Sequence, residues 1–328
     1  MTVDRHRLFS LATDNFYWNG RYHNPEHIPQ AGLRDFIAWQ WRTGFHFPEK
    51  KPQPWCRPEM ARLQVPTTDR QLTWLGHACF LVQVNGINTL TDPIFSERCS
   101  PWQFMGPKRF TPAVIRVDEL PEIHRVVISH NHYDHLDEAT VVALARRFPE
   151  VRFLVPQGVA QWFAQRNIPN VDELGWWQSV ELGEAEEAFC LPVQHFSGRT
   201  LRDRNRTLWC SWLLRQHDRY WYFAGDTGYG KIFGTLGEIF SQIDLALLPI
   251  GAYNPRELAA AVHVNPEEAV RIHQDLRARQ SVAMHWGTFA LTLEPVDEPP
   301  KKLAEALAAA AVDPSAFAVF DQGETRAW

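Results

Sequence analysis

The pattern of apolar and polar positions changes near Leu72. Over residues 1–70 no period is sustained, and prolines interrupt the chain repeatedly, as in P-E-H-I-P and F-P-E-K-K-P-Q-P-W. From Leu72 onward, short apolar runs alternate with polar turns, which is typical of packed strands and helices. We therefore expect an irregular, aromatic and proline-rich N-terminal extension over residues 1–70, packed on a main domain over residues 71–328.

Short apolar runs with polar turns between them predict the β-strands of this main domain. Asn85-Gly86 separates two such runs, and this dipeptide favours a two-residue hairpin turn. The expected strands are Cys79–Val84, Ile87–Leu90, Val126–Ile128, Phe153–Val155, Phe189–Val193, Leu208–Leu214, Tyr220–Phe223, Leu245–Ile250, Ser281–Met284 and Ala316–Phe320.

Helices are expected between and after these strands. Leu136–Phe148 has its apolar residues on one helical face, and Ala304–Ala311 also reads as a helix. Asn265 is a good N-cap, followed by proline and two acidic residues, so a helix should run from there to about Arg279. Because strands cluster without strict strand–helix alternation, we expect an α+β protein in which helices cover two packed sheets.

Composition narrows the class of protein. The 328 residues are 45% hydrophobic and 22% charged, and the net charge of −5 is unlike that of a nucleic-acid-binding protein. The five cysteines are odd in number and lack C-x-x-C spacing, which argues against a disulfide framework and a thiolate zinc site. No signal-peptide core or membrane-spanning run is present, so we expect a cytoplasmic protein without a transmembrane segment.

Tryptophan is frequent, with 14 residues, and several lie in the extension at Ile37–Phe47 and Pro54–Cys56. Tryptophan beside arginine is typical of a membrane interface or a partner surface. An aromatic cover that simply buries area on the main domain is the plainer alternative. A peripheral membrane contact through this segment and a homodimer therefore both stay open.

The stretch S-H-N-H-Y-D-H-L-D, from Ser129 to Asp137, carries three histidines and two aspartates between a predicted strand and a predicted helix. Imidazole and carboxylate groups suit zinc and similar divalent ions. In an extended turn, His130 and His132 point the same way and can bind one ion. Asp134 and His135 then turn toward the helix and can reach a second ion.

Three further residues share one position in the pattern. His195, Asp226 and His285 each follow the end of a predicted apolar strand. Alone, each would be read as an ordinary buried or surface residue. Strand ends of this kind meet at one rim of the sheets, so together with the first cluster they predict a metal site.

The motif H-N-H-Y-D-H resembles the H-x-H-x-D-H signature of the metallo-β-lactamase fold, and His195, Asp226 in A-G-D-T-G and His285 in M-H-W-G follow in that superfamily's order. The stretches W-L-G-H-A-C-F-L-V-Q, T-D-P-I-F-S-E-R-C-S-P, G-P-K-R-F and H-V-N-P-E-E-A also resemble the branch of phospholipases D that hydrolyse N-acylphosphatidylethanolamine, with its bacterial relatives. The resemblance covers about Leu72 to Phe289. It implies a four-layer αββα sandwich of two mixed β-sheets, with two divalent metal ions between them.

The resemblance also implies roles for individual residues. Asp134 would bind metal and orient the attacking hydroxide, while Asp226 would bridge the two ions. His263 would contact the phosphate or act as an acid, although a helix-entry histidine with no chemical role is an equal alternative. The implied ligands are His130, His132 and His195 for the first ion and Asp134, His135 and His285 for the second, with His77, Asp92 and Asn131 supporting them from behind.

The function implied is a metal-dependent hydrolase, favoured as a phosphodiesterase of phospholipase D type. A metal-bridging hydroxide would attack the phosphorus of an N-acylphosphatidylethanolamine-like lipid or a small phosphodiester. The ions would be Zn²⁺, with Mn²⁺ or Fe²⁺ as alternatives. The competing interpretations are a lactone or ester hydrolase for a soluble metabolite, phosphorylated or not, and a metal-binding module without catalysis.

Overall fold

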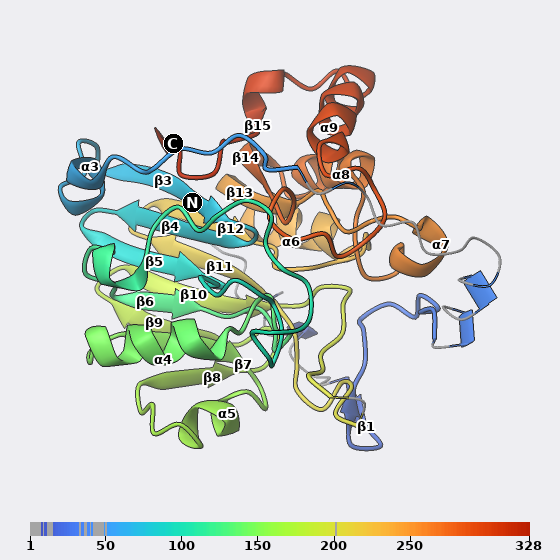
Figure 1. Cartoon of the computed structure of the whole chain (residues 1–328), viewed down its shortest axis with the longest axis horizontal. Coiled ribbons are helices and arrows are strands. Elements are labelled where there is room, and N and C mark those ends of the chain that lie inside the picture. The colour runs from blue at the N-terminus through green and yellow to red at the C-terminus, as the bar shows by residue number, and fades with distance from the viewer. Residues whose placement is uncertain are drawn as a thin grey trace.

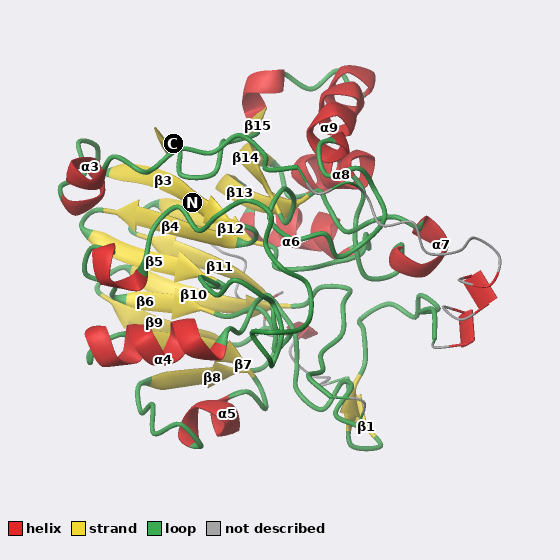
Figure 2. Cartoon of the chain, in the orientation of Figure 1, coloured by secondary structure: helices red, strands yellow, loops and turns green. Residues whose placement is uncertain are grey.

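A computed structural model describes residues 8, 10–11, 16–32, 34–35, 38–39, 41, 49, 51–200 and 202–328. In this part of the chain, two seven-stranded sheets pack face to face, and helices cover their outer faces (Figure 1). Helices, strands and loops are distinguished in Figure 2, where long loops gather at one end of the strands. The predicted α+β sandwich of four layers is confirmed.

The first sheet has the strand order β16-β3-β4-β5-β6-β7-β8. Its neighbours are antiparallel from β16 to β5 and parallel from β5 to β8, so the sheet is mixed. The strands are β3 (Arg70–Gly76), β4 (Cys79–Val84), β5 (Ile87–Thr91), β6 (Arg125–Val127), β7 (Arg152–Pro156), β8 (Val171–Leu174) and β16 (Thr325–Ala327).

The second sheet has the order β15-β14-β13-β12-β11-β10-β9. It is parallel from β15 to β12 and antiparallel from β12 to β9. The strands are β9 (Ser179–Gly183), β10 (Glu186–Leu191), β11 (Ser211–Gln216), β12 (Arg219–Phe223), β13 (Ile243–Pro249), β14 (Ala278–Met284) and β15 (Phe317–Ala318).

The helices form the two outer layers. Beside the first sheet lie α4 (Glu138–Arg147) and α5 (Ala160–Ala164), and beside the second lie α6 (Ile232–Phe240), α8 (Pro266–Asp275) and α9 (Glu298–Ala309) (Figure 1). The remaining short elements are α3 (Met60–Gln64), α7 (Arg256–Ala259), the 3₁₀ helices η1 (Val117–Glu119) and η2 (Pro314–Ala316), and the strands β1 (Tyr17–Trp18) and β2 (Arg21–Tyr22).

The alternation of side chains along the strands builds two cores. Val127 and Leu154 face the second sheet and join the central core, whereas Val126 and Phe153 face the layer of α4 and α5. Trp212 of β11 is fully buried between the sheets, and its Nε1 donates to the Ile128 carbonyl at 2.8 Å. The sheets are therefore joined directly behind the loop that starts at Ser129.

Most predicted elements are confirmed, with shifted ends. The hairpin at Asn85-Gly86 is present between β4 and β5. The helix after Asn265 ends at Asp275 and not near Arg279, because Arg277 adopts a left-handed φ of 53° and β14 begins one residue later. The strand expected over Leu208–Leu214 begins only at Ser211, since residues 208–210 belong to the preceding loop.

The segment before residue 70 is less irregular than expected. Asn19-Gly20 forms the turn of a small hairpin between β1 and β2, with φ values of 53° and 72°, and α3 follows later. The tryptophan-rich stretch Ile37–Phe47 lies largely outside the described residues. The division into an extension and a catalytic domain at residue 70 stays a prediction.

Strand direction determines where the site lies. In the first sheet β3, β5 and β6 run the same way, and in the second sheet β10, β12 and β14 do. Side chains that follow their C-terminal ends therefore gather at one edge of each sheet. The residues that follow these ends are His77, Asp92, His130, His195, Asp226 and His285.

Candidate metal centre

Three histidines form the first group of the site. His130 Nε2 lies 2.7 Å from His132 Nδ1, and His195 Nε2 lies 3.4 Å from the same nitrogen. Burial lowers the pKa of His130 and His195 well below the ordinary value and that of His132 to about 4. The three rings are therefore neutral at pH 7, which is the form that binds metal.

Hydrogen bonds assign the tautomers of two of these rings. Ser129 Oγ donates to Asp92, so it accepts from His130 Nδ1 at 2.9 Å. His195 Nδ1 donates to the Val262 carbonyl at 2.8 Å. The Nε2 lone pairs of His130 and His195 consequently converge on His132, an arrangement that a cation between the three rings would satisfy.

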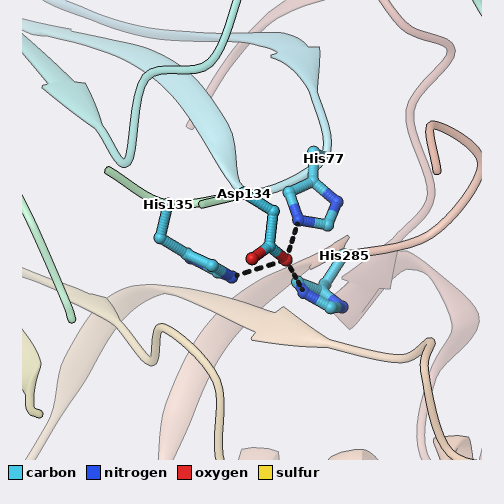
Figure 3. Close-up of side chains that lie close together, drawn as sticks. All are labelled: His77, Asp134, His135 and His285. Carbon is cyan, nitrogen blue, oxygen red and sulfur yellow. Dashed lines mark hydrogen bonds and ion pairs between the residues drawn. The ribbon is translucent and has the colours of Figure 1, made fainter. Parts of the chain in front are cut away.

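The second group gathers around Asp134 (Figure 3). Asp134 Oδ2 lies 3.0 Å from His77 Nε2, 3.3 Å from His135 Nε2 and 3.5 Å from His285 Nε2. Burial alone would raise the pKa of Asp134, but His135, His285 and His77 hold it well below its usual range. All three of these contacts are made by one carboxylate oxygen, Oδ2.

Asp226 connects the two groups. Its Oδ2 lies 3.2 Å from His135 Nε2 and 3.7 Å from His195 Nε2, and its Oδ1 lies 3.1 Å from His285 Nε2. The carboxylate is almost fully buried. Burial alone would raise its pKa, yet His135 and His285 lower it well below the ordinary value. Asp226 is thus an ionised carboxylate between two sets of histidines.

The second group requires positive charge. Burial would lower the pKa of His135, but the carboxylates of Asp226, Asp134 and Asp92 raise it well above its ordinary value. Burial would also lower the pKa of His285, but Asp226 and Asp134 raise it to about 9. His135 Nε2, Asp226 Oδ1 and His285 Nε2 are buried without a hydrogen-bond partner among the described residues. Divalent ions with nitrogen and oxygen ligands fit this donor set.

Asp92 lies behind the candidate ligands. It is fully buried and accepts hydrogen bonds from the Ser129 amide at 2.7 Å, from the Ser129 hydroxyl and from His135 Nδ1 at 2.6 Å. A carboxylate in this position fixes the tautomer and the orientation of His135, so that Nε2 faces Asp134 and Asp226. Asp92 itself adopts a left-handed φ of 33° in order to turn into the site.

The family follows from comparison with known proteins. A family model described as a beta-lactamase superfamily domain matches residues 87–286. The chain belongs to the metallo-β-lactamase superfamily. It is 40% identical to an N-acyl-phosphatidylethanolamine-hydrolyzing phospholipase D of Caenorhabditis elegans, over 77% of this chain and 74% of that protein. It is also 31% identical to a metal-dependent hydrolase of Pyrobaculum aerophilum, over 67% of this chain and 86% of that one.

A solved structure agrees with the fold of the superfamily. A metallo hydrolase of Ignicoccus hospitalis superposes with a TM-score of 0.61 at 21% identity, over 80% of this chain and 99% of that one. Together with the family and its relatives, the buried histidine and aspartate groups make this chain a metal-dependent hydrolase. Across the described residues, no helix combines the length and apolar character that crossing a bilayer requires.

Arg199 contacts the candidate site, although no pattern in the sequence singles it out. Its Nη1 donates to the carbonyls of Asn131 and Leu136 at 2.9 and 2.8 Å, and its guanidinium lies 3.9 Å from the ring centre of Tyr133. Asn131, expected beside the site, uses its side-chain Oδ1 to accept from the Gly198 amide at 2.8 Å. These contacts tie both ends of the superfamily motif to the loop after His195.

His77 and His263 lie closer to the ligands than their sequence contexts suggest. His77 touches Asp134 directly, and its backbone amide donates to Thr288 Oγ1 at 2.8 Å. His263 Nδ1 lies 3.9 Å from Asp226 Oδ2 and has no hydrogen-bond partner among the described residues. Both residues also meet the geometric condition for a metal ligand, His77 with Asp134, His135 and His285, and His263 with His195 and Asp226.

An apolar cavity of about 350 Å³ adjoins the metal centre. His263 is one of its few polar lining residues, and Arg204 is the charged one. Its apolar lining includes Trp39, Phe196, Leu258, Val262, Leu291 and Leu293. The Phe196 ring packs 4.5 Å from that of His132, so the cavity wall continues directly into the first histidine group.

Asp92→Asn should lower the retention of metal about 10- to 100-fold. Asparagine keeps the side-chain shape but cannot accept from the Ser129 hydroxyl, the Ser129 amide and His135 together, so the orientation of His135 is lost. Metal per chain after dialysis against graded chelator measures this change.

The matched control for this substitution is Asp69→Asn, because Asp69 is exposed and distant in the chain from every ligand. Far-ultraviolet circular dichroism should show that both variants are folded. Metal retention by Asp92→Asn equal to that of Asp69→Asn would contradict the supporting role of Asp92.

Proposed function

We propose that this protein is a phosphodiesterase of phospholipase D type that hydrolyses N-acylphosphatidylethanolamine-like lipids. The observation that carries the proposal is the apolar cavity that meets the metal centre at His263 and Phe196. An apolar cavity beside a hydrolytic centre suits a substrate with a hydrocarbon chain near its scissile bond. The nematode relative, 40% identical, is named for this reaction.

We assign two ion positions to the two groups. His130, His132 and His195 would hold the first ion, and their converging lone pairs support this assignment. Asp134, His135 and His285 would hold the second, and Asp226 would bind both, since it is in contact with members of each group. Zn²⁺, Mn²⁺ and Fe²⁺ all suit histidine and carboxylate ligands.

Divalent ions bound there would act as Lewis acids on the phosphoryl oxygens and allow water to serve as a nucleophile near pH 7. Asp134 would orient that water, because three histidines hold its carboxylate in place through Oδ2 and the second oxygen could then accept from the water. The side chain is 14% exposed, so water can reach it. Addition of water to phosphorus would release N-acylethanolamine and leave phosphatidic acid.

His263 would contact the substrate phosphate. Burial lowers the pKa of its imidazole to about 4, so the ring is neutral at pH 7 and keeps one N–H to donate. The ring lies between the cavity and Asp226, which is where a phosphate attached to a chain in the cavity would sit. His77, which contacts Asp134, would hold that carboxylate in place.

The first prediction from the proposed function concerns products. Metal-loaded protein given N-acylphosphatidylethanolamine in ¹⁸O-water should release N-acylethanolamine, with the label in phosphatidic acid, because water adds to phosphorus. Mass spectrometry of both products measures this. Protein stripped of metal should be inactive and should recover with Zn²⁺, Mn²⁺ or Fe²⁺.

A small aryl phosphodiester is assayed beside the lipid. Cleavage of the aryl diester alone would keep the phosphodiesterase chemistry and reject the lipid substrate. Hydrolysis of esters or lactones, with no cleavage of either diester, would reject the phosphodiesterase.

The second prediction concerns the cavity. Leu258→Trp fills part of it and should lower kcat/KM for a long-chain lipid about tenfold or more, which corresponds to about 1.4 kcal/mol. The variant should hydrolyse the small aryl diester within about twofold of the wild-type rate, since no group near the ions changes. Val65→Trp on the exposed surface is the control. Equal losses with both substrates would show that the cavity does not hold the chain.

The third prediction separates two roles of His263. His263→Ala should lower kcat about 100-fold while metal content stays unchanged, because the ring donates to the phosphate and does not bind an ion. Metal analysis of the same preparation distinguishes these roles, with His217→Asn in the exposed turn after β11 as the control. Loss of about one metal ion per chain would make His263 a ligand instead.

A further inference from the structure

A segment of the N-terminal region crosses the site at His195. Residues 22–32, here called the strap, run over the loop that follows β10. Tyr22 N donates to the Asn205 carbonyl at 2.8 Å, and Gln194 Nε2 donates to the Glu26 carbonyl at 3.2 Å. Glu26 Oε1 in turn accepts from the Lys231 amide at 2.5 Å. The strap is therefore joined to three separate segments of the main domain.

Asn24 makes the contact that matters for the metal centre. Its Oδ1 accepts from the His195 amide at 3.0 Å, and its Nδ2 donates to the His195 carbonyl at 2.9 Å. One carboxamide thus satisfies both backbone groups of a single residue. β10 ends at Leu191, so His195 has no strand neighbour to provide these bonds.

Two further hydrogen bonds fix this pair. Trp209 Nε1 donates to Asn24 Oδ1 at 3.1 Å, and Gln30 Nε2 donates to the His195 carbonyl at 3.2 Å. Trp209 is buried, so the carboxamide of Asn24 is held on its inner side by a rigid ring. With the Nδ1 of His195 bonded to Val262, the backbone and the ring of this histidine are both immobilised.

The strap also forms one wall of the cavity. Gln30, Ala31 and Gly32 line it, together with Leu258 and Val262 of the main domain. The segment that fixes His195 thus also limits the space available beside His263. The strap precedes residues 87–286, which the superfamily model matches, yet it contacts both the His195 backbone and the cavity.

We propose that Asn24 is a positioning residue for the metal ligand His195 and that the strap is an integral part of the catalytic centre. This inference rests on the assignment of His195 as a ligand in the proposed function. Without Asn24 the His195 backbone loses a donor and an acceptor together, and Nε2 no longer holds its place beside His130 and His132. The ion of the first group is then lost before the ion of the second.

The test is metal retention in Asn24→Ala, compared with Asn170→Ala. Asn170 is the control because its side chain also bonds a backbone carbonyl, that of Pro149, far along the chain from the ligands. Both variants are loaded with Zn²⁺ and dialysed against graded chelator, and metal per chain is measured. We expect Asn24→Ala to lose one ion at about tenfold lower chelator concentration, and Asn170→Ala to match the wild type.

An absorption spectrum distinguishes a displaced His195 ring from a general loss of stability. With Co²⁺ in place of Zn²⁺, the visible absorption of Asn24→Ala should change in shape or intensity, because a ligand nitrogen of the first group has moved. Asn24→Asp keeps the acceptor for the His195 amide and should fall between Asn24→Ala and the wild type. An unchanged cobalt spectrum and unchanged chelator resistance in Asn24→Ala would overturn the proposal.

His195→Ala separates the assignment of His195 as a ligand from the positioning role of Asn24. If His195→Ala keeps both ions, the ligand assignment fails and the inference fails with it. If His195→Ala loses one ion while Asn24→Ala keeps both, only the positioning role fails. Should Asn24→Ala not fold, as judged by circular dichroism, Asn24→Asp and Gln30→Ala carry the same test, and wild-type metal retention in both would overturn the proposal.

Discussion

The charge balance around His135 is the constraint on which the rest of the site depends. Asp92, Asp134 and Asp226 surround this ring, and all three carboxylates are removed from bulk solvent to a large degree. Buried carboxylates without counter-charge are costly, so a fold that gathers three of them must supply cations nearby. The carboxylates around them raise the pKa of His135 and of His285, which favours positive charge on both rings. Divalent ions at the two groups would meet this requirement with far more charge.

This arrangement requires strained backbone conformations at several site residues. His77, Asp92 and His285 adopt left-handed φ values of 54°, 33° and 60°, each costing about 1–2 kcal/mol for a residue with a side chain. At Gly225 only glycine fits, because a Cβ there would lie 2.5 Å from the Cβ of Ser129. Strain of this kind persists only where rigid surroundings determine it. Two sheets joined by Trp212 behind Ser129 provide those surroundings.

The sequence was most informative where chemistry and periodicity coincide. The H-x-H-x-D-H spacing and the strand-end positions of His195, Asp226 and His285 were sufficient to place the ligand candidates together, because parallel strand ends meet at one edge. Arg199 and Asn24 could not be found in this way. Each acts through bonds to a backbone that is distant in sequence, and a single arginine or asparagine in a loop carries no period. Arg277 likewise ends α8 by its conformation, which its residue type does not reveal.

Chemistry and substrate choice are separated in this architecture. The candidate ligands lie at strand ends or in the loop after β6, where the two sheets fix them, and ions held there would polarise a phosphoryl or an acyl oxygen equally well. The cavity is built instead from loops and short elements, including the strap, Phe196, α7 and residues 291–293. Such segments can change length and composition without disturbing the sheets. The same ligands could therefore support hydrolysis of a lipid or of a soluble ester. The cavity walls beside His263 would determine which of the two substrates binds.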